Sequence, residues 1–159
     1  MSDTNAPPNK SASDSESATR QREAVEKLLA RDAAVSAGSV QVDGRDRSYT
    51  VHAAFMPVAA TGMASAGAPP EAAVFTVAYL EQAVAPAQRP VCFAFNGGPG
   101  SASIWLHLGA LGPKRVVVPD DGSMPLPPYG VEDNPHSWFE HFDLVFVDPV
   151  GTGFSRVIE

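Results

Sequence analysis

The stretch VCFAFNGGPGSASIWLHLGALG, Val91–Gly112, decides the fold of this 159-residue chain. It begins with Val91–Phe95, an apolar run without polar alternation, which is typical of a strand buried on both faces of a parallel sheet. It closes with Ala102–Leu111, where we expect a crossover helix. Between them stands a loop with three glycines and one proline. The stretch therefore predicts a strand, a special loop and a helix in direct succession.

The loop composition indicates a binding site for an anion. Gly97, Gly98 and Gly100 allow backbone angles closed to other residues and let N–H groups approach a ligand, and a helix N-terminus adds partial positive charge. A tight turn alone rarely needs this density of glycine and proline. The segment Ser101–Ser103 supplies neither the Lys-Ser or Lys-Thr of a P-loop nor a dinucleotide-binding glycine. The remaining common anion is the oxyanion of acyl transfer in an α/β-hydrolase.

Three further segments have strand composition. Arg47–Val58 and Glu71–Leu80 are rich in β-branched and aromatic residues, and we expect them to pair antiparallel. Leu144–Val147 is a short apolar run, so it is predicted as a second strand buried on both faces, left at the sheet edge without a neighbour. Before it, residues 119–135 are predicted as an irregular Pro-rich loop. The order predicts an α/β fold: the N-terminal half of an α/β-hydrolase sheet, with a leading hairpin followed by parallel strands.

The N-terminal residues divide into two predicted segments. Residues 1–18 have almost nothing to bury and are predicted to be a disordered tail. Residues 19–40 are predicted to be an amphipathic helix, capped by Thr19 and followed by a linker. Residues 41–159 form the predicted α/β domain.

The charge and the single cysteine narrow the classes of partner and compartment. A formal net charge of −7, without a basic cluster, argues against nucleic acid and against an anionic membrane surface as partners. Cys92 alone cannot form an internal disulfide. Met1–Val40 contains no apolar core of signal-peptide length, which slightly favours the cytoplasm.

Several ordered motifs resemble the serine carboxypeptidases, peptidase family S10. They are FNGGPGSAS, LGALGP, NPHSW and DLVFVDPVGTGFSR, and the similarity covers roughly Arg47 to Arg156. The resemblance implies the α/β-hydrolase fold and hydrolysis of C-terminal peptide bonds through an acyl-enzyme. It implies a peptide or protein substrate with a free C-terminus, and neither a cofactor nor a metal.

The resemblance also assigns roles to residues of the loop. It implies that Gly98 donates a backbone N–H to the oxyanion, that Gly97 shapes the loop, and that Asn96 binds the substrate carboxylate. Two positions depart from the pattern, because Ala110 stands where many relatives have a carboxylate-binding Glu and Ala94 where they have Trp. We therefore expect the complete enzyme to depend less on acidic pH.

The chain contains no Gly-x-Ser-x-Gly elbow. The family's Ser, Asp and His are expected after Glu159, so the fragment alone is expected to be inactive. Two alternatives remain open: a prolyl-aminopeptidase-like α/β-hydrolase, and a non-catalytic truncated module that binds peptides. The sequence leaves the oligomeric state undetermined.

The remaining polar candidates match no catalytic or metal-binding spacing and are predicted to pack or to face solvent. They are His52, His107, His136, His141, Cys92, Asp120, Asp121, Glu132 and Asp133.

Overall fold

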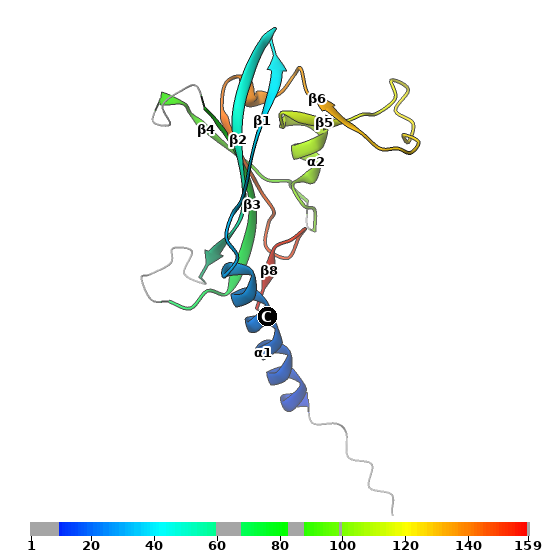
Figure 1. Cartoon of the computed structure of the whole chain (residues 1–159). Coiled ribbons are helices and arrows are strands. Elements are labelled where there is room, and N and C mark those ends of the chain that lie inside the picture. Colours follow the sequence, from blue (N-terminus) through cyan, green and yellow to red (C-terminus); the bar gives the residue numbers. More distant parts are fainter. Residues whose placement is uncertain (1–9, 60–67, 83–87, 99, 159) are drawn as a thin grey trace, which may run out of the picture.

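The structure is a computed structural model that describes residues 10–59, 68–82, 88–98 and 100–158. One long helix, α1 (Lys10–Leu29), precedes all of the strands (Figure 1). The strands are β1 (Ala34–Val42), β2 (Arg45–Val58), β3 (Ala72–Glu81), β4 (Val91–Ala94), β5 (Lys114–Val116), β6 (Val131–Asp133), β7 (Asp143–Val147) and β8 (Arg156–Val157). The short helices are α2 (Ile104–Leu106), the π-helical turn η2 (His107–Leu111) and the 3₁₀ turn η3 (Trp138–Glu140).

The main sheet has the order β1-β2-β3-β7-β4, with β8 also paired to β3. The strands β1, β2 and β3 form an antiparallel meander, in which Phe55 lies opposite Phe75. This confirms the predicted antiparallel pairing of β2 and β3. The predicted α/β class is confirmed as a mixed α/β fold, but most of the sheet is antiparallel.

The predicted position of the last strand is wrong. β7 was expected at the open edge, but it lies between β3, to which it is antiparallel, and β4, to which it is parallel. β3 and β4 are separated in the sheet by one strand position, which β7, later in the chain, fills. Neighbours in a sequence are not always neighbours in a sheet, which is why the order could not be predicted from succession alone.

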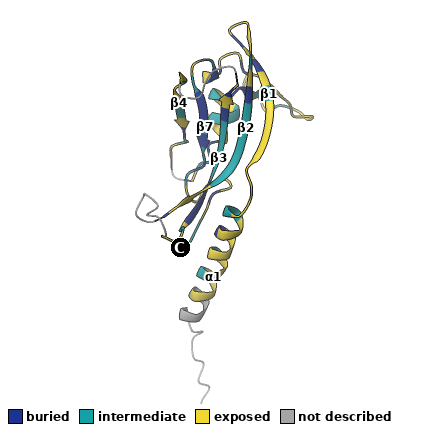
Figure 2. Cartoon of the chain, turned by 60° about the vertical axis from the view of Figure 1, so that its left-hand side comes forward, coloured by how far each residue is buried: buried dark blue, intermediate teal, exposed yellow. Residues whose placement is uncertain are grey.

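The edge strand is therefore β4, and its burial differs from the prediction. Val91 and Phe93 are 46% and 65% exposed, whereas Ala94 on the opposite face is buried. β7 contains the fully buried Leu144 and lies in the middle of the burial-coloured ribbon in Figure 2. Of the two apolar strands, only β7 has neighbours on both sides. The face of β4 that carries Val91 and Phe93 is not covered by another layer among the described residues.

The N-terminal segments also differ from the prediction. Helix α1 begins at Lys10, so residues 10–18 are helical rather than a disordered tail, and residues 1–9 lie outside the described residues. Thr19 is not a cap, because its hydroxyl donates to the Ser15 carbonyl within the helix. A lack of apolar residues weakens packing, but it does not prevent Ala, Lys and Glu from forming a helix. The predicted linker also contains strand, since β1 begins at Ala34.

Helix α1 packs on the sheet with the apolar side that the sequence predicts. Val25 is completely buried, and the helix contacts β2, β3 and β8 before its N-terminal half extends away from the sheet (Figure 1). No helix within the described residues has the length and apolar character that crossing a membrane requires.

The core lies on one face of the sheet, under the crossover formed by α2 and η2. Tyr49 and Tyr79 pack edge to face, with ring centroids 5.2 Å apart, and Tyr49 packs in the same way on Phe139. The buried core residues are Val40, Val42, Tyr49, Tyr79, Ala94, Phe139, Leu144 and Phe146. The predicted helix over Ala102–Leu111 is present from Ile104.

A two-stranded sheet, β5 and β6, follows the crossover. β6 falls within the predicted irregular loop of residues 119–135, so this part of the loop is a strand. Because β6 is only three residues long and fully exposed, no apolar alternation marks it.

Candidate functional site

The glycine loop leaves β4 at the carboxyl end of the strand, where the parallel neighbour β7 also ends. Gly98 has φ +77° and Gly100 has φ +89°, both in the left-handed region that glycine adopts without strain. A Cβ atom at Gly97, Gly98 or Gly100 would meet nothing within 4 Å. Gly98 and Gly100 are therefore needed for their backbone angles, whereas Gly97 has no positive φ, and a side chain at any of the three positions would have open space among the described residues.

The N–H groups of Gly97 and Gly98 have no hydrogen-bond partner within the described residues. Both residues are exposed. Asn96 is half-buried, and its side-chain Nδ2 donates to the Gly97 carbonyl at 3.1 Å. The structure thus brings the three residues predicted for the site, Asn96, Gly97 and Gly98, to one exposed loop with two unused backbone donors.

Ser103 closes this loop and links it to the sheet. Its hydroxyl accepts the N–H of Asn96 at 3.2 Å and donates to the carbonyl of Val147, the last residue of β7. The residue is 1% exposed. The two ends of the loop are therefore held at one buried hydroxyl above the end of β7.

Asp148 follows β7 directly and is buried. Its Oδ1 accepts the N–H of Ser103 at 2.9 Å, and its Oδ2 accepts the N–H of Phe154 at 3.2 Å. The Ser155 hydroxyl donates to the Asp148 carbonyl and accepts the N–H of Phe75, both at 2.8 Å. These bonds join the glycine loop, the turn after β7 and β3 in one buried polar network.

Sequence reasoning placed the turn from Asp148 to Ser155 near the site by resemblance to the family, but it gave no role to Asp148 or to Ser103. One signal was available, because Asp148 is an acidic residue placed immediately after a buried apolar strand. No comparable signal marks Ser103, which is one of two serines after the loop.

His107 lies beneath the loop, in the first turn of η2. Its Nε2 is 2.6 Å from the Tyr79 hydroxyl, and its ring stacks on Phe146 with centroids 4.5 Å apart. Burial lowers the pKa of His107 to about 4, although the charge of Asp148 acts in the opposite direction. Burial likewise raises the pKa of Tyr79 to about 12. Both side chains are consequently neutral at pH 7, in agreement with the predicted packing role of this histidine.

Two cavities adjoin the crossover, and neither is lined by Asn96, Gly97 or Gly98. One, of about 250 Å³, lies between Ser103, His107, Asp148 and the aromatic side chain of Phe154. The other, of about 840 Å³, lies on the far side of α2. It is lined by residues that include Trp105, Val118, Met124, Tyr129 and Glu132. Gly97, Gly98 and Gly100 are exposed, so the described part of the glycine loop lies outside both of these cavities and at the surface.

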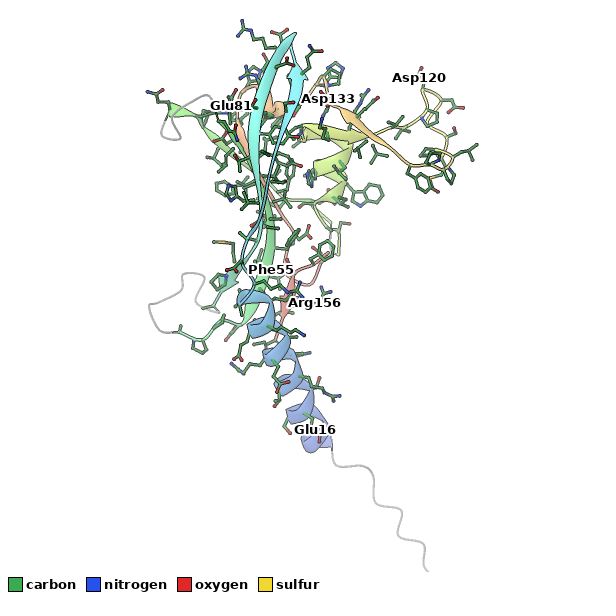
Figure 3. All side chains as sticks on the ribbon, in the orientation of Figure 1. Glu16, Phe55, Glu81, Asp120, Asp133 and Arg156 are labelled. Carbon is green, nitrogen blue, oxygen red and sulfur yellow. The ribbon has the colours of Figure 1, made fainter. Side chains whose placement is uncertain are left out.

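Cys92 lies in β4, just before the loop, and packs against the core, as predicted for a core residue. The four acidic candidates lie on β6 or on the segment that joins it to β5: Asp120, Asp121, Glu132 and Asp133. Figure 3 shows Asp120 at the far end of the segment that joins β5 to β6. Glu132 and Asp133 form ion pairs with Arg115 and Lys114 across β5 and β6. Among the described residues, no group of three or more His, Cys, Asp or Glu side chains is placed to hold a metal ion.

Comparison with known proteins identifies the family. The serine carboxypeptidase family model, Peptidase_S10, matches residues 59–158, which is well over half of the chain. The chain is 32% identical to a pheromone-processing carboxypeptidase KEX1 of Puccinia graminis over 109 residues, or 67% of this chain and 15% of the relative.

Two shorter matches come from other organisms. Carboxypeptidase Y of Schizosaccharomyces pombe is 36% identical over 79 residues, which are 49% of this chain and 7% of the relative. Serine carboxypeptidase-like 34 of Arabidopsis thaliana is 37% identical over 78 residues, which are 48% of this chain and 14% of the relative. The chain spans only 7–15% of the length of these relatives. The motifs around the glycine loop and the family match agree: the chain belongs to the serine carboxypeptidase family, peptidase family S10.

Proposed function

We propose that this chain is the oxyanion-binding part of a serine-type carboxypeptidase whose Ser, Asp and His lie in further sequence after Glu159. The observation that supports the proposal most is the pair of N–H groups at Gly97 and Gly98, which have no partner in the described part of the chain and lie at the carboxyl end of parallel strand β4. Ligands of open α/β sheets bind beyond the carboxyl ends of the strands. Backbone donors there suit an oxyanion that forms only during the reaction.

In the proposed reaction, the Ser hydroxyl attacks the carbonyl carbon of the last peptide bond while the His removes its proton. The former carbonyl oxygen becomes an oxyanion and accepts the N–H of Gly98. The intermediate expels the C-terminal amino acid, which takes the proton from His. Water then hydrolyses the acyl-enzyme. The fragment by itself lacks these steps and is proposed to be inactive.

Asn96 is the proposed contact for the substrate carboxylate. A side-chain amide has two N–H donors. One of them is bound to the Gly97 carbonyl, which fixes the direction of the amide. The second can donate to a carboxylate. The chain has Ala110 where a family Glu would share this contact, so Asn96 is proposed to make a larger part of it.

The same proposal extends to the fold. The parallel pair β4 and β7 is proposed to be the start of the parallel part of an α/β-hydrolase sheet, within one domain that includes residues 41–159. The exposed side chains of Val91 and Phe93 support this, because parallel strands are normally covered on both faces. A further strand beside β4 would satisfy its free edge.

The activity is tested on the complete polypeptide encoded with this sequence. We expect cleavage of an N-blocked dipeptide with a free C-terminus and no cleavage of the same dipeptide with a C-terminal amide. A prolyl-aminopeptidase-like enzyme would instead need a free N-terminus, and a non-catalytic module would cleave neither. Reaction of the isolated 159-residue chain with a fluorophosphonate would contradict the proposed location of the nucleophile.

The carboxylate contact is tested on the 159-residue chain by an NMR titration. The resonances of the Asn96 side-chain amide should shift with the N-blocked free-acid dipeptide and stay unchanged with its amide. Asn96→Ala in the complete enzyme should raise KM for the free acid. A shift of equal size with both ligands would remove Asn96 from the carboxylate site.

A further inference from the structure

The carboxylate of Asp148 is unusual because it is buried without a cation. The described residues contain no Lys or Arg in an ion pair with it, and the titratable side chain whose charge it influences is the neutral His107. A buried carboxylate is costly unless hydrogen bonds satisfy it. Here the partners are two backbone N–H groups, those of Ser103 and Phe154. The negative charge of Asp148 is thus stabilised by two backbone segments, at Ser103 and at Phe154, and holds them together.

The segment that it holds is the closing end of the glycine loop. Ser103 donates its N–H to Asp148, and its hydroxyl binds the N–H of Asn96 at the opening end. Between these anchors, a side chain at Gly97, Gly98 or Gly100 would contact nothing. Within the described residues, the glycine positions make no side-chain contacts that could fix the loop, so its two ends are held by the hydrogen bonds at Asn96 and Ser103.

The backbone around Asp148 leaves room for this carboxylate. A Cβ atom at Gly153 would lie 2.7 Å from Cγ of Asp148 and would also collide with Oδ2, whereas a Cβ atom at Gly151 would meet nothing within 4 Å. Both glycines have positive φ, +50° and +77°. The Cβ atom at Gly153 would also lie 3.0 Å from Cβ of Ala102 in the glycine loop, so the pair Gly153→Ala and Gly151→Ala compares a change that disturbs Asp148 and Ala102 with one that disturbs neither.

We infer that Asp148 is a positioning residue for the oxyanion donor: through Ser103, its carboxylate holds the glycine loop so that the N–H of Gly98 stays directed outward and unpaired. The inference rests on the proposed function for its catalytic consequence. It assigns to the turn after β7 a role in setting loop geometry. The turn does so without any contact between Asp148 and the substrate.

Because Asp148 is negatively charged, the direction in which kcat changes in Asp148→Asn distinguishes a positioning role from no role. A negative carboxylate near an oxyanion opposes the developing charge, so a bystander Asp148 would predict that Asp148→Asn leaves kcat unchanged or raises it. A positioning role predicts the reverse. The Asn side chain cannot accept from both Ser103 and Phe154, because its Nδ2 is a donor. One of the two bonds to a backbone N–H group, at Ser103 or at Phe154, is then lost, and the Asn NH₂ group opposes the N–H that it faces.

The first arm of the test uses NMR on the 159-residue chain. The backbone amide resonances of Gly97 and Gly98 should shift in Gly153→Ala and in Asp148→Asn and stay in place in Gly151→Ala. Ser103→Ala is the second route if either variant fails to fold, since it removes the hydroxyl link to Asn96 and leaves the carboxylate intact. Unmoved resonances in all the folded variants would overturn the inference.

The second arm measures kinetics of the complete enzyme. Gly153→Ala and Asp148→Asn should lower kcat by about 100-fold, the effect expected of small misplacements at a reacting centre, with KM within about twofold. Gly151→Ala should keep kcat near the unmodified value. A kcat that is equal in Gly153→Ala and Gly151→Ala, or raised in Asp148→Asn, would overturn the inference. Absence of peptidase activity in the unmodified enzyme would instead reject the proposed function, while the NMR arm would still decide the anchoring.

Discussion

A buried aspartate lies at each end of β7: Asp143 begins the strand and Asp148 directly follows it. The two carboxylates have opposite kinds of partner. At the entry, Asp143 pairs with Arg89 at 3.0 Å, and Arg89 also pairs with Glu81 at 2.7 Å. At the exit, Asp148 binds only backbone N–H groups. The entry is a cluster of paired charges, whereas the exit holds a loop whose N–H groups at Gly97 and Gly98 have no partner among the described residues.

The entry cluster is further tied to the backbone. Arg89 donates to the carbonyls of Phe139, Glu140 and Phe142, and its guanidinium lies 5.1 Å from the centroid of the Phe139 ring. Arg47 adds a second cation beside Glu81, which Figure 3 labels near the end of the sheet. Two cations and two carboxylates leave no net charge to offer a ligand. The comparison teaches that the exit end of β7 is suited to binding, and the entry end to stability.

The largest expected effect comes from Arg89→Met. This change leaves Glu81 and Asp143 buried and deprived of their shared cation, so the free energy of unfolding should fall by about 3–5 kcal/mol. Urea denaturation of the 159-residue chain measures it. Arg115→Ala is the control, because the Arg115–Glu132 pair is exposed. Its loss should cost less than about 1 kcal/mol. Equal losses would mean that the entry cluster has no special part in stability.

The second effect is a pH dependence at the exit end. The pKa of His107 is lowered from 6.5 to about 4 in the folded chain, so the unfolded chain binds a proton first as the pH falls. Stability from the neutral ring is complete above about pH 6.5 and is lost progressively towards pH 4, by about 3 kcal/mol in all. The difference in unfolding free energy between the unmodified chain and His107→Gln isolates this contribution. A difference that does not vary with pH would contradict the assignment.

A smaller effect is expected from Tyr79→Phe. The change removes the hydroxyl that lies 2.6 Å from His107 Nε2 while it keeps the aromatic ring in the core. Loss of one hydrogen bond between neutral groups should lower the free energy of unfolding by about 1 kcal/mol. Urea denaturation at pH 7 gives the value. If the free energy of unfolding fell as much as in Arg89→Met, the neutral contact between Tyr79 and His107 would be as important for stability as the ionic contacts of Arg89.

The smallest effect is expected away from β7, in Lys114→Ala. Lys114 pairs with Asp133 on the exposed β5–β6 hairpin, and this hydrogen bond is the main reason why the pKa of Asp133 is lowered. The variant should raise the pKa of Asp133 towards its ordinary value, as followed by NMR titration. Stability should change by less than about 1 kcal/mol. An unchanged pKa would show that the N–H of Gln41, the second donor to Asp133, is sufficient alone.

The local elements of the fold were predictable, but their order in the sheet was not. The apolar runs of β4 and β7 and the β-branched segments of β2 and β3 were visible in the sequence, because side-chain pattern reflects burial. The place of β7 between β3 and β4 depends on which strands meet in space. Helix α1 was predicted to begin nine residues too late, at Thr19 instead of Lys10, since few apolar residues were taken to mean no helix.

The candidate site shows the same division. The three glycines after Asn96 predicted a loop with backbone angles that only glycine adopts easily, and the positive φ values of Gly98 and Gly100 agree with that prediction. The roles proposed for Asn96 and Gly98 remain predictions. Ser103 and Asp148 were missed because they are 45 residues apart and meet only when β7 is placed beside β4. A sequence pattern shows local conformation, but not which distant side chain holds it.

The central claim is that the N–H of Gly98 receives the oxyanion. The most direct measurement is a crystal structure of the complete enzyme with a peptide phosphonate, whose charged oxygen stands for that oxyanion. The account predicts roughly 2.7–3.1 Å between Gly98 N and the phosphonyl oxygen. A phosphonyl oxygen bound by other donors, with Gly98 N out of hydrogen-bond range, would contradict it.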